Sequence, residues 1–152
     1  MIDFLRRLFS EEPAQLPLEE VSLALAVLLV RVARSDGDYS APEMGRIDRV
    51  LAQRFGLDPW AACGLRAQAE SIEAEAPDTV RFTRVIKDGV AIEDRIGLVE
   101  ALWQVVLADG GRDAMEDRMM RLIVSLLGVT DSESGLARQR VLRQSEADDA
   151  GI

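Results

Sequence analysis

Apolar residues recur every three or four positions through almost the whole sequence, and short turns rich in Gly, Pro and Asp interrupt them. This spacing is typical of amphipathic α-helices. No segment alternates apolar and polar residues between turn signals, as a half-buried strand would. With 152 residues, the chain is the size of one ordinary domain. We therefore predict an all-α fold, a single compact bundle of about seven or eight helices.

The first half of the chain carries the signals of a buried central helix. Pro17 can occupy the first turn of a helix over residues 18–35, whose apolar residues cover most of the circumference. Ser40 and Glu43 then have capping-box spacing for a second helix, which Gly56 ends. Further helices are expected between Asp58 and Pro77 and from Thr79 to about Ile86, the latter ending at Gly89.

The same pattern recurs in the second half. A strongly apolar helix through residues 96–107 ends at Gly110, as the first helix ends at Gly37. The next helix ends at Gly128, as its counterpart ends at Gly56. Asp113 and Glu116 repeat the capping-box spacing, and Thr130 or Asp131 can cap a last helix that runs to about Arg143.

The chain therefore contains two copies of a helix-turn-helix repeat, over about residues 18–74 and 91–143. The copies are offset by 73 residues at the Asp-Gly pairs and by 72 at Gly56 and Gly128. Two copies are too few for a solenoid, for which at least three stacked repeats are expected. We predict that pseudo-twofold symmetry relates them within one bundle and that both Asp-Gly turns lie at the same end.

Three segments are expected: a short N-terminal helix and linker over residues 1–16, the helical domain over 17–144, and an acidic, frayed tail over 145–152. The stretch "MIDFLRRLF" is expected to dock on the bundle rather than lie on a membrane surface. The longest apolar run has 8 residues, whereas a membrane-spanning helix needs about 20. No signal-peptide pattern is found. A cytoplasmic location is therefore expected, with membrane contact at most through the N-terminal segment.

Several conspicuous side chains are expected to be structural. Trp60, Trp103 and Phe82 occur at helical spacing and are expected in the core. The single cysteine, Cys63, is expected to be a small packing residue, because it lies in an Ala-rich helix and the chain has no histidine to activate it. The arginines of the last helix are expected to form a solvated face: Arg138, Arg140 and Arg143.

The net charge of −9 narrows the classes of partner. Proteins that bind nucleic acids generally do so through clustered Lys and Arg, so no nucleic acid is expected here, while cations or partners with a basic surface suit the chain better. The chain has no histidine, and its sequence shows no phosphate loop and no activated nucleophile. We therefore expect no enzymatic activity.

The sequence Asp-Gly-(five residues)-Glu occurs twice, in "SDGDYSAPE" and in "ADGGRDAME". In a purely structural interpretation, Gly37 and Gly110 close helices, and Glu43 and Glu116 are capping-box partners of the helices that follow. Asp36 and Asp109 can then accept hydrogen bonds from turn amides, as Asp commonly does. Nearly every residue of the pattern has a structural role in this interpretation.

A functional interpretation adds a metal site. If the two turns meet, their carboxylates repel one another unless a cation or protons join them. Ligands that are all oxygen suit a hard divalent ion such as calcium, magnesium or manganese. The spacing is not that of an EF-hand, which needs a glutamate at its twelfth position. The candidate ligands are Asp36, Asp38, Glu43, Asp109, Asp113 and Glu116.

The segments "LLVRVARSDGDYSAPEMGRIDRVLAQRFGLD" and "ALWQVVLADGGRDAMEDRMMRLIVSLLGVTDSE" resemble the TerB-like family, named for a tellurite-resistance protein and also found beside a DnaJ-type co-chaperone module. The resemblance covers roughly residues 18 to 140. It implies a compact helical bundle, a connection with tellurite and other chemical stress, and metal binding at the acidic turns. The resemblance thus implies a metal-binding role for Asp36, Glu43, Asp109 and Glu116.

Two functions therefore remain open. The first is a non-enzymatic stress or accessory module that binds a divalent cation, a partner protein, or both through the acidic turns. The alternative is a purely structural helical domain for protein–protein interaction, without an ion site.

Overall fold

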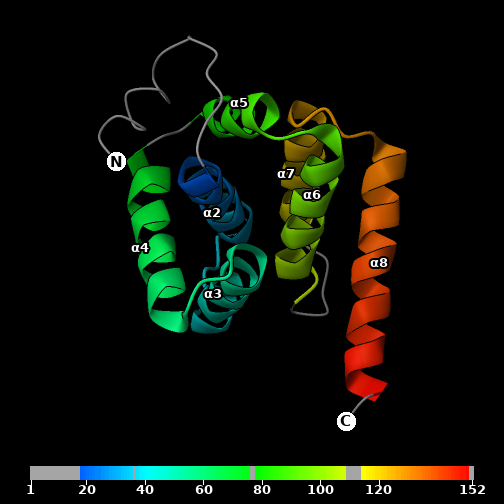
Figure 1. Ribbon diagram of the computed structural model, residues 1–152, viewed down its shortest axis with the longest axis horizontal. Helices are drawn as coiled ribbons and strands as arrows, with labels where there is room; N and C mark the ends of the chain where they lie inside the picture. The colour runs from blue at the N-terminus through cyan, green and yellow to red at the C-terminus, as the bar shows by residue number, and fades with distance from the viewer. Residues whose placement is uncertain (1–17, 36, 76–77, 109–113, 151–152) are drawn as a thin grey trace.

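The computed structural model describes residues 18–35, 37–75, 78–108 and 114–150. These residues form seven α-helices and no strand, which confirms the all-α prediction (Figure 1). The expected N-terminal helix lies outside them. The helices are α2 (Leu18–Arg34), α3 (Ala41–Phe55), α4 (Pro59–Glu75), α5 (Thr79–Gly89), α6 (Ile92–Val106), α7 (Ala114–Leu126) and α8 (Asp131–Ala150).

Helix α2 is the centre of the core, as its sequence predicts. Apart from Arg31, every residue from Val21 to Ala33 is buried. The helix packs against α3, α4, α5, α6 and α7, and it can do so because its apolar side chains point in all directions. The other helices each bury one face against it or against a neighbour.

The two predicted repeats correspond to α2–α4 and α6–α8, and α5 joins them. The same pairs pack within each repeat: the first helix against the third and the second, and the second against the third. Gly56 and Gly128 end the two middle helices with positive φ angles of 64° and 73°, a conformation that glycine adopts without strain. Residues beyond each glycine close the helix in the same way, since Leu57 N donates to the Ala52 carbonyl and Val129 N to the Val124 carbonyl.

Helices α2 and α6 run in the same direction, so both end at the lower side of Figure 1. Each is followed by its Asp-Gly pair, so this direction agrees with the prediction that both turns lie at one end of the bundle. Asp36 and residues 109–113 lie outside the described residues, and the separation between Asp36 and Asp109 stays a prediction. None of the described helices has the length and hydropathy needed to cross a membrane.

Three sequence-based expectations about side chains are wrong. Trp60 is 88% exposed, because the buried stripe of α4 contains Ala62 and Ala69 and Trp60 lies about 200° around the helix from Ala62. Cys63 is also exposed, so it is not a packing residue. The arginines of α8 are not all solvated: Arg138 stacks on Trp103 and Arg140 pairs with Glu100.

The boundaries of the helices agree closely with the local signals, except at the C-terminus and at the start of α6, where Ala91 makes no side-chain capping hydrogen bond. Asp58 accepts a hydrogen bond from Ala61 N at 2.8 Å at the start of α4, and Asp78 caps α5. Thr130, one of the two expected caps, forms a capping box with Glu133 at the start of α8. Helix α8 continues past the predicted end at Arg143 to Ala150.

Candidate functional site

The first Asp-Gly turn begins where α2 ends. Ser35 Oγ donates a hydrogen bond to the Val32 carbonyl at 2.6 Å, and Gly37 N donates to the Arg34 carbonyl at 3.0 Å. Gly37 has a φ of 82°, so the predicted closing glycine is confirmed. The turn is therefore held by its own backbone and by the last turn of α2.

Glu43 is the buried end of a capping box. Its side chain Oε1 accepts a hydrogen bond from Ser40 N at 3.1 Å, and Ser40 Oγ accepts one from Glu43 N at 3.4 Å. Ser40 Oγ also donates to Glu43 Oε1 at 3.1 Å. Glu43 is only 5% exposed, so the capping role predicted from its spacing is confirmed.

The structure describes the side chains of only two of the six candidate ligands, Asp38 and Glu43. Asp38 is exposed at the first turn, whereas Glu43 is buried in its capping box. Asp36, Asp109 and Asp113 lie outside the described residues, as does the side chain of Glu116. Among the residues that the structure does describe, no three His, Cys, Asp or Glu side chains are grouped so that they could hold a metal ion. The six ligands remain a prediction.

A cation–π contact ties the first turn to the neighbouring helices. The Arg34 guanidinium lies 5.0 Å from the centre of the Tyr39 ring, and Arg34 Nη1 pairs with Glu73 Oε2 of α4 at 2.6 Å. Burial and the nearby Glu70 carboxylate raise the pKa of Tyr39 above its ordinary value of about 10. The nearby Arg66 guanidinium acts in the opposite direction and lowers the pKa of Tyr39, but burial and Glu70 outweigh it.

A second arginine, Arg66 of α4, joins this helix to α3. Arg66 Nε pairs with Asp48 Oδ1 at 2.6 Å, and Arg66 Nη1 pairs with Glu70 Oε1 at 3.1 Å. Burial alone would lower the pKa of Arg66, but Asp48 and Glu70 raise it above the ordinary value, so the guanidinium stays charged. Sequence reasoning missed Arg34, Tyr39 and Arg66, because their main partners lie on other helices.

The capping role of Glu43 can be tested separately from any ion. We expect Glu43→Ala to lower the free energy of unfolding by about 0.5–2 kcal/mol in the presence of a chelator, because the Ser40 amide loses its acceptor. Glu43→Gln should stay close to wild type, since its amide oxygen can still accept. Urea denaturation measures the free energy of unfolding of both variants. Ser40→Ala, which removes the other side chain of the capping box, is a second test of the same interaction. Wild-type stability in Glu43→Ala would contradict the capping role.

The comparison with known families supports the likeness seen in the sequence. The family model described as tellurite resistance protein TerB matches residues 22–139, which is most of the chain. No curated protein and no solved structure shows significant similarity. The matched region includes both Asp-Gly pairs, helices α3 to α7 and most of α2. The chain belongs to the TerB family of tellurite-resistance proteins.

Proposed function

We propose that this chain is a non-enzymatic, cytoplasmic accessory module in the response to tellurite or metal stress, and that it binds a divalent cation at the end of the bundle where α2 and α6 end. The observation that carries the proposal is the common direction of these two helices, each followed by an Asp-Gly pair (Figure 1). Membership of the TerB family supports the connection with tellurite resistance.

The two described carboxylates differ in what they can offer a cation. Glu43 Oε1 already accepts the hydrogen bonds of its capping box, so a cation would have to share this carboxylate. Asp38 is exposed and can reach a cation from solvent. We therefore assign the main role to the aspartates, with Asp36 and Asp38 from the first turn and Asp109 and Asp113 from the second. Their oxygen ligands favour calcium, magnesium or manganese.

Calorimetric titration and melting curves of a chelator-treated sample test this proposal. A cation that binds the folded state stabilises it by RT ln(1 + [L]/Kd), about 2.7 kcal/mol at one hundred times Kd. We expect wild type to show this gain with calcium, magnesium or manganese, and the Asp36→Asn, Asp109→Asn double variant to lose it. Without cation, the double variant should be at least as stable as wild type, because it removes carboxylate repulsion.

The matched control is Asp88→Asn. Asp88 is an exposed carboxylate at the end of α5, and Figure 1 shows α5 at the side of the bundle opposite the ends of α2 and α6. This variant should keep the full cation response. If wild type gives no binding heat and the same melting curve with every cation, the aspartates are turn residues only and the cation proposal fails.

A protein-interaction domain without an ion site is the second candidate. The observation that favours it is Trp60, which is 88% exposed in the first turn of α4. Exposed aromatic side chains are frequent anchors of protein interfaces. The net charge of −9 favours a partner with a basic surface. For a partner identified by its gene neighbourhood, Trp60→Ala should weaken binding while the Asp36→Asn, Asp109→Asn variant should not.

A further inference from the structure

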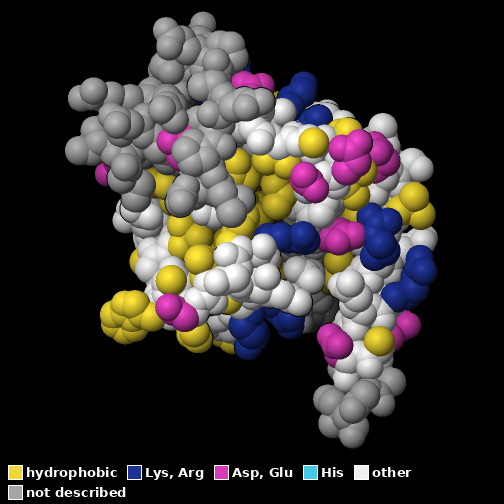
Figure 2. Space-filling view, in the orientation of Figure 1, with side chains coloured by type: hydrophobic (Ala, Val, Ile, Leu, Met, Phe, Trp, Pro, Cys, Tyr) yellow, Lys and Arg dark blue, Asp and Glu magenta, His cyan; other side chains and the backbone are white. Residues whose placement is uncertain are grey.

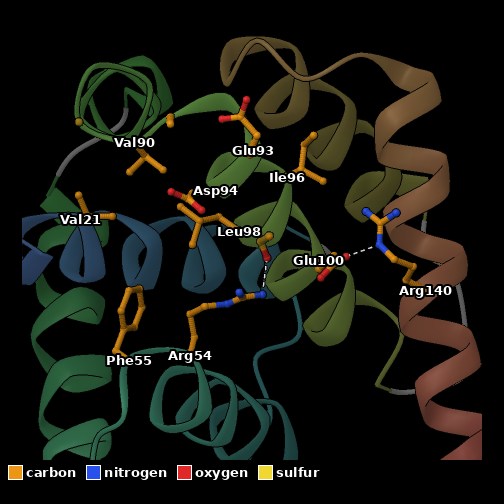
Figure 3. A pocket seen from close by; sticks show the side chains of 13 residues that line it. Val21, Arg54, Phe55, Val90, Glu93, Asp94, Ile96, Leu98, Glu100 and Arg140 are labelled. Atoms are coloured by element: carbon orange, nitrogen blue, oxygen red, sulfur yellow. Dashed lines mark hydrogen bonds and ion pairs between the residues drawn. The ribbon is translucent and has the colours of Figure 1, made fainter.

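An open groove of about 840 Å³ lies between the start of α2, the end of α3 and the first half of α6 (Figure 3). Val21 and Leu98 at its base belong to the buried core, while Phe55, Val90 and Ile96 are only half-buried. Figure 2 shows hydrophobic side chains exposed in the hollow at the middle of this face. The groove is therefore an apolar surface that the described helices leave uncovered.

The charged side chains that line the groove differ in whether they have a partner among the described residues. Arg54 Nη2 donates to the Gly97 carbonyl, and Glu100 pairs with Arg140. Glu93 and Asp94 are exposed, and neither forms an ion pair with another described residue. In Figure 3 the Asp94 side chain points over the apolar base, near Val90 and Leu98. The groove thus combines an apolar base with two carboxylates that can accept a basic group.

The residues that precede α2 can reach this groove. Helix α2 begins at Leu18, and Val21, in its first turn, already lines the groove. The chain therefore enters α2 beside the groove. The eight residues 10–17 can span at most about 26–29 Å, which is comparable to the diameter of a small domain. Residues 1–9 are therefore within reach of the groove from any direction of approach.

The sequence of residues 1–9 complements the groove. In "MIDFLRRLF", Phe4, Leu5, Leu8 and Phe9 fall on one face of a helix, and Arg6 and Arg7 lie between them in sequence. We propose that residues 1–9 dock into this groove, with their apolar face against its base and with the two arginines facing Glu93 and Asp94. Docking removes the exposed apolar surface from water and pairs both carboxylates.

The docked segment lies apart from the proposed cation site. The groove is bordered by the link between α5 and α6, whereas α2 and α6 end at the other side of the bundle (Figure 1). Failure of cation binding would therefore leave the docking proposal standing, and failure of docking would leave cation binding standing.

Paramagnetic relaxation in the full-length chain tests the docking. In a Cys63→Ser background, a nitroxide is attached through Ala91→Cys, because Ala91 is exposed and lines the groove. We expect broadening of the amide signals of residues 4–9. The control label is attached through Ser145→Cys, an exposed position in the C-terminal half of α8. This label should leave the signals of residues 4–9 sharp.

Two further samples identify the occupant. In a Phe4→Asp, Leu8→Asp variant with the label at position 91, the broadening should disappear while the α2–α8 amide signals stay in place, which shows that the bundle is folded. Mixing isotope-labelled chains that lack nitroxide with unlabelled chains that carry it should give no broadening. Broadening in the mixture would assign the groove to a second copy and overturn the proposal. Sharp signals of residues 4–9 with the label at position 91 would also overturn it.

Discussion

Trp103→Ala is expected to lower the free energy of unfolding by about 3–5 kcal/mol, the usual cost of truncating a buried aromatic side chain. Trp103 lies in α6 and is 7% exposed. Its Nε1 donates a hydrogen bond to Ser134 Oγ of α8 at 3.1 Å, and the Arg138 guanidinium lies 5.8 Å from the ring centre. The substitution therefore opens a cavity and also leaves the buried Ser134 hydroxyl without this donor. Denaturation in guanidinium chloride measures the loss.

Trp60→Ala is the matched control, because it makes the same chemical change at an exposed position. Trp60 is 88% exposed, so the change in the free energy of unfolding should stay within about 0.5 kcal/mol. The two variants also separate the fluorescence of the chain's two tryptophans, since only the buried one should shift strongly on unfolding. Equal losses of stability in the two variants would contradict the burial of Trp103 in the α6–α8 contact.

The second large effect is expected at Arg66. Its side chain is 13% exposed, and those of Asp48 and Glu70 are 24% and 20% exposed. Arg66→Met keeps most of the apolar stem but leaves two partly buried carboxylates without their cation. We expect a loss of about 2–3 kcal/mol, between the roughly 3–5 kcal/mol for breaking a buried pair and the less than about 1 kcal/mol for a surface pair. Urea denaturation near pH 7 provides the measurement.

Arg140→Met is the matched control, because it breaks an ion pair that is more exposed to water. The Arg140 side chain also pairs with a carboxylate on another helix, Glu100 of α6, but it is 42% exposed. Water can solvate Glu100 after the substitution, so the loss should stay below about 1 kcal/mol. A loss as large as that of Arg66→Met would mean that burial does not set the difference between the two pairs.

The side-chain contacts that join the helices differ between the two repeats. Arg34 and Arg66 connect α4 to α2 and α3 through ion pairs. In the second repeat, Trp103 and Arg140 connect α6 to α8 through an indole hydrogen bond and one ion pair. The helix order and the closing glycines are shared, but the side chains that join the helices differ. Equivalent positions of the repeats therefore need not have equivalent functions.

The helix boundaries could be predicted wherever a local signal sets them. Ser40, Asp58 and Thr130 each accept a hydrogen bond from the backbone amide three residues later, so a short stretch of sequence contains all the participants. The acidic tail predicts that α8 ends at about Arg143, and this boundary is wrong. Helix α8 continues to Ala150 because no Gly or Pro interrupts the sequence between Arg143 and Gly151.

At the candidate site too, only the contacts between residues close in sequence could be predicted. The capping box of Glu43 and the closing role of Gly37 follow from spacing and are confirmed. The meeting of the two Asp-Gly turns depends on how the repeats pack, and so does any cation site they form. Spacing within one turn contains no information about its distance from the other, and for that reason the ligand set remains a prediction.

The sequence alone predicts the number and order of the described helices, the buried position of α2 and the turns that separate the helices, because these depend on residues three or four positions apart. The packing of the helices is what buries Trp103 and leaves Trp60 exposed. Packing also pairs Arg66 with Asp48, 18 residues away, and Arg140 with Glu100, 40 residues away. Helical periodicity fixes which side chains share a face, but burial and charge pairing depend on which faces meet when the helices pack.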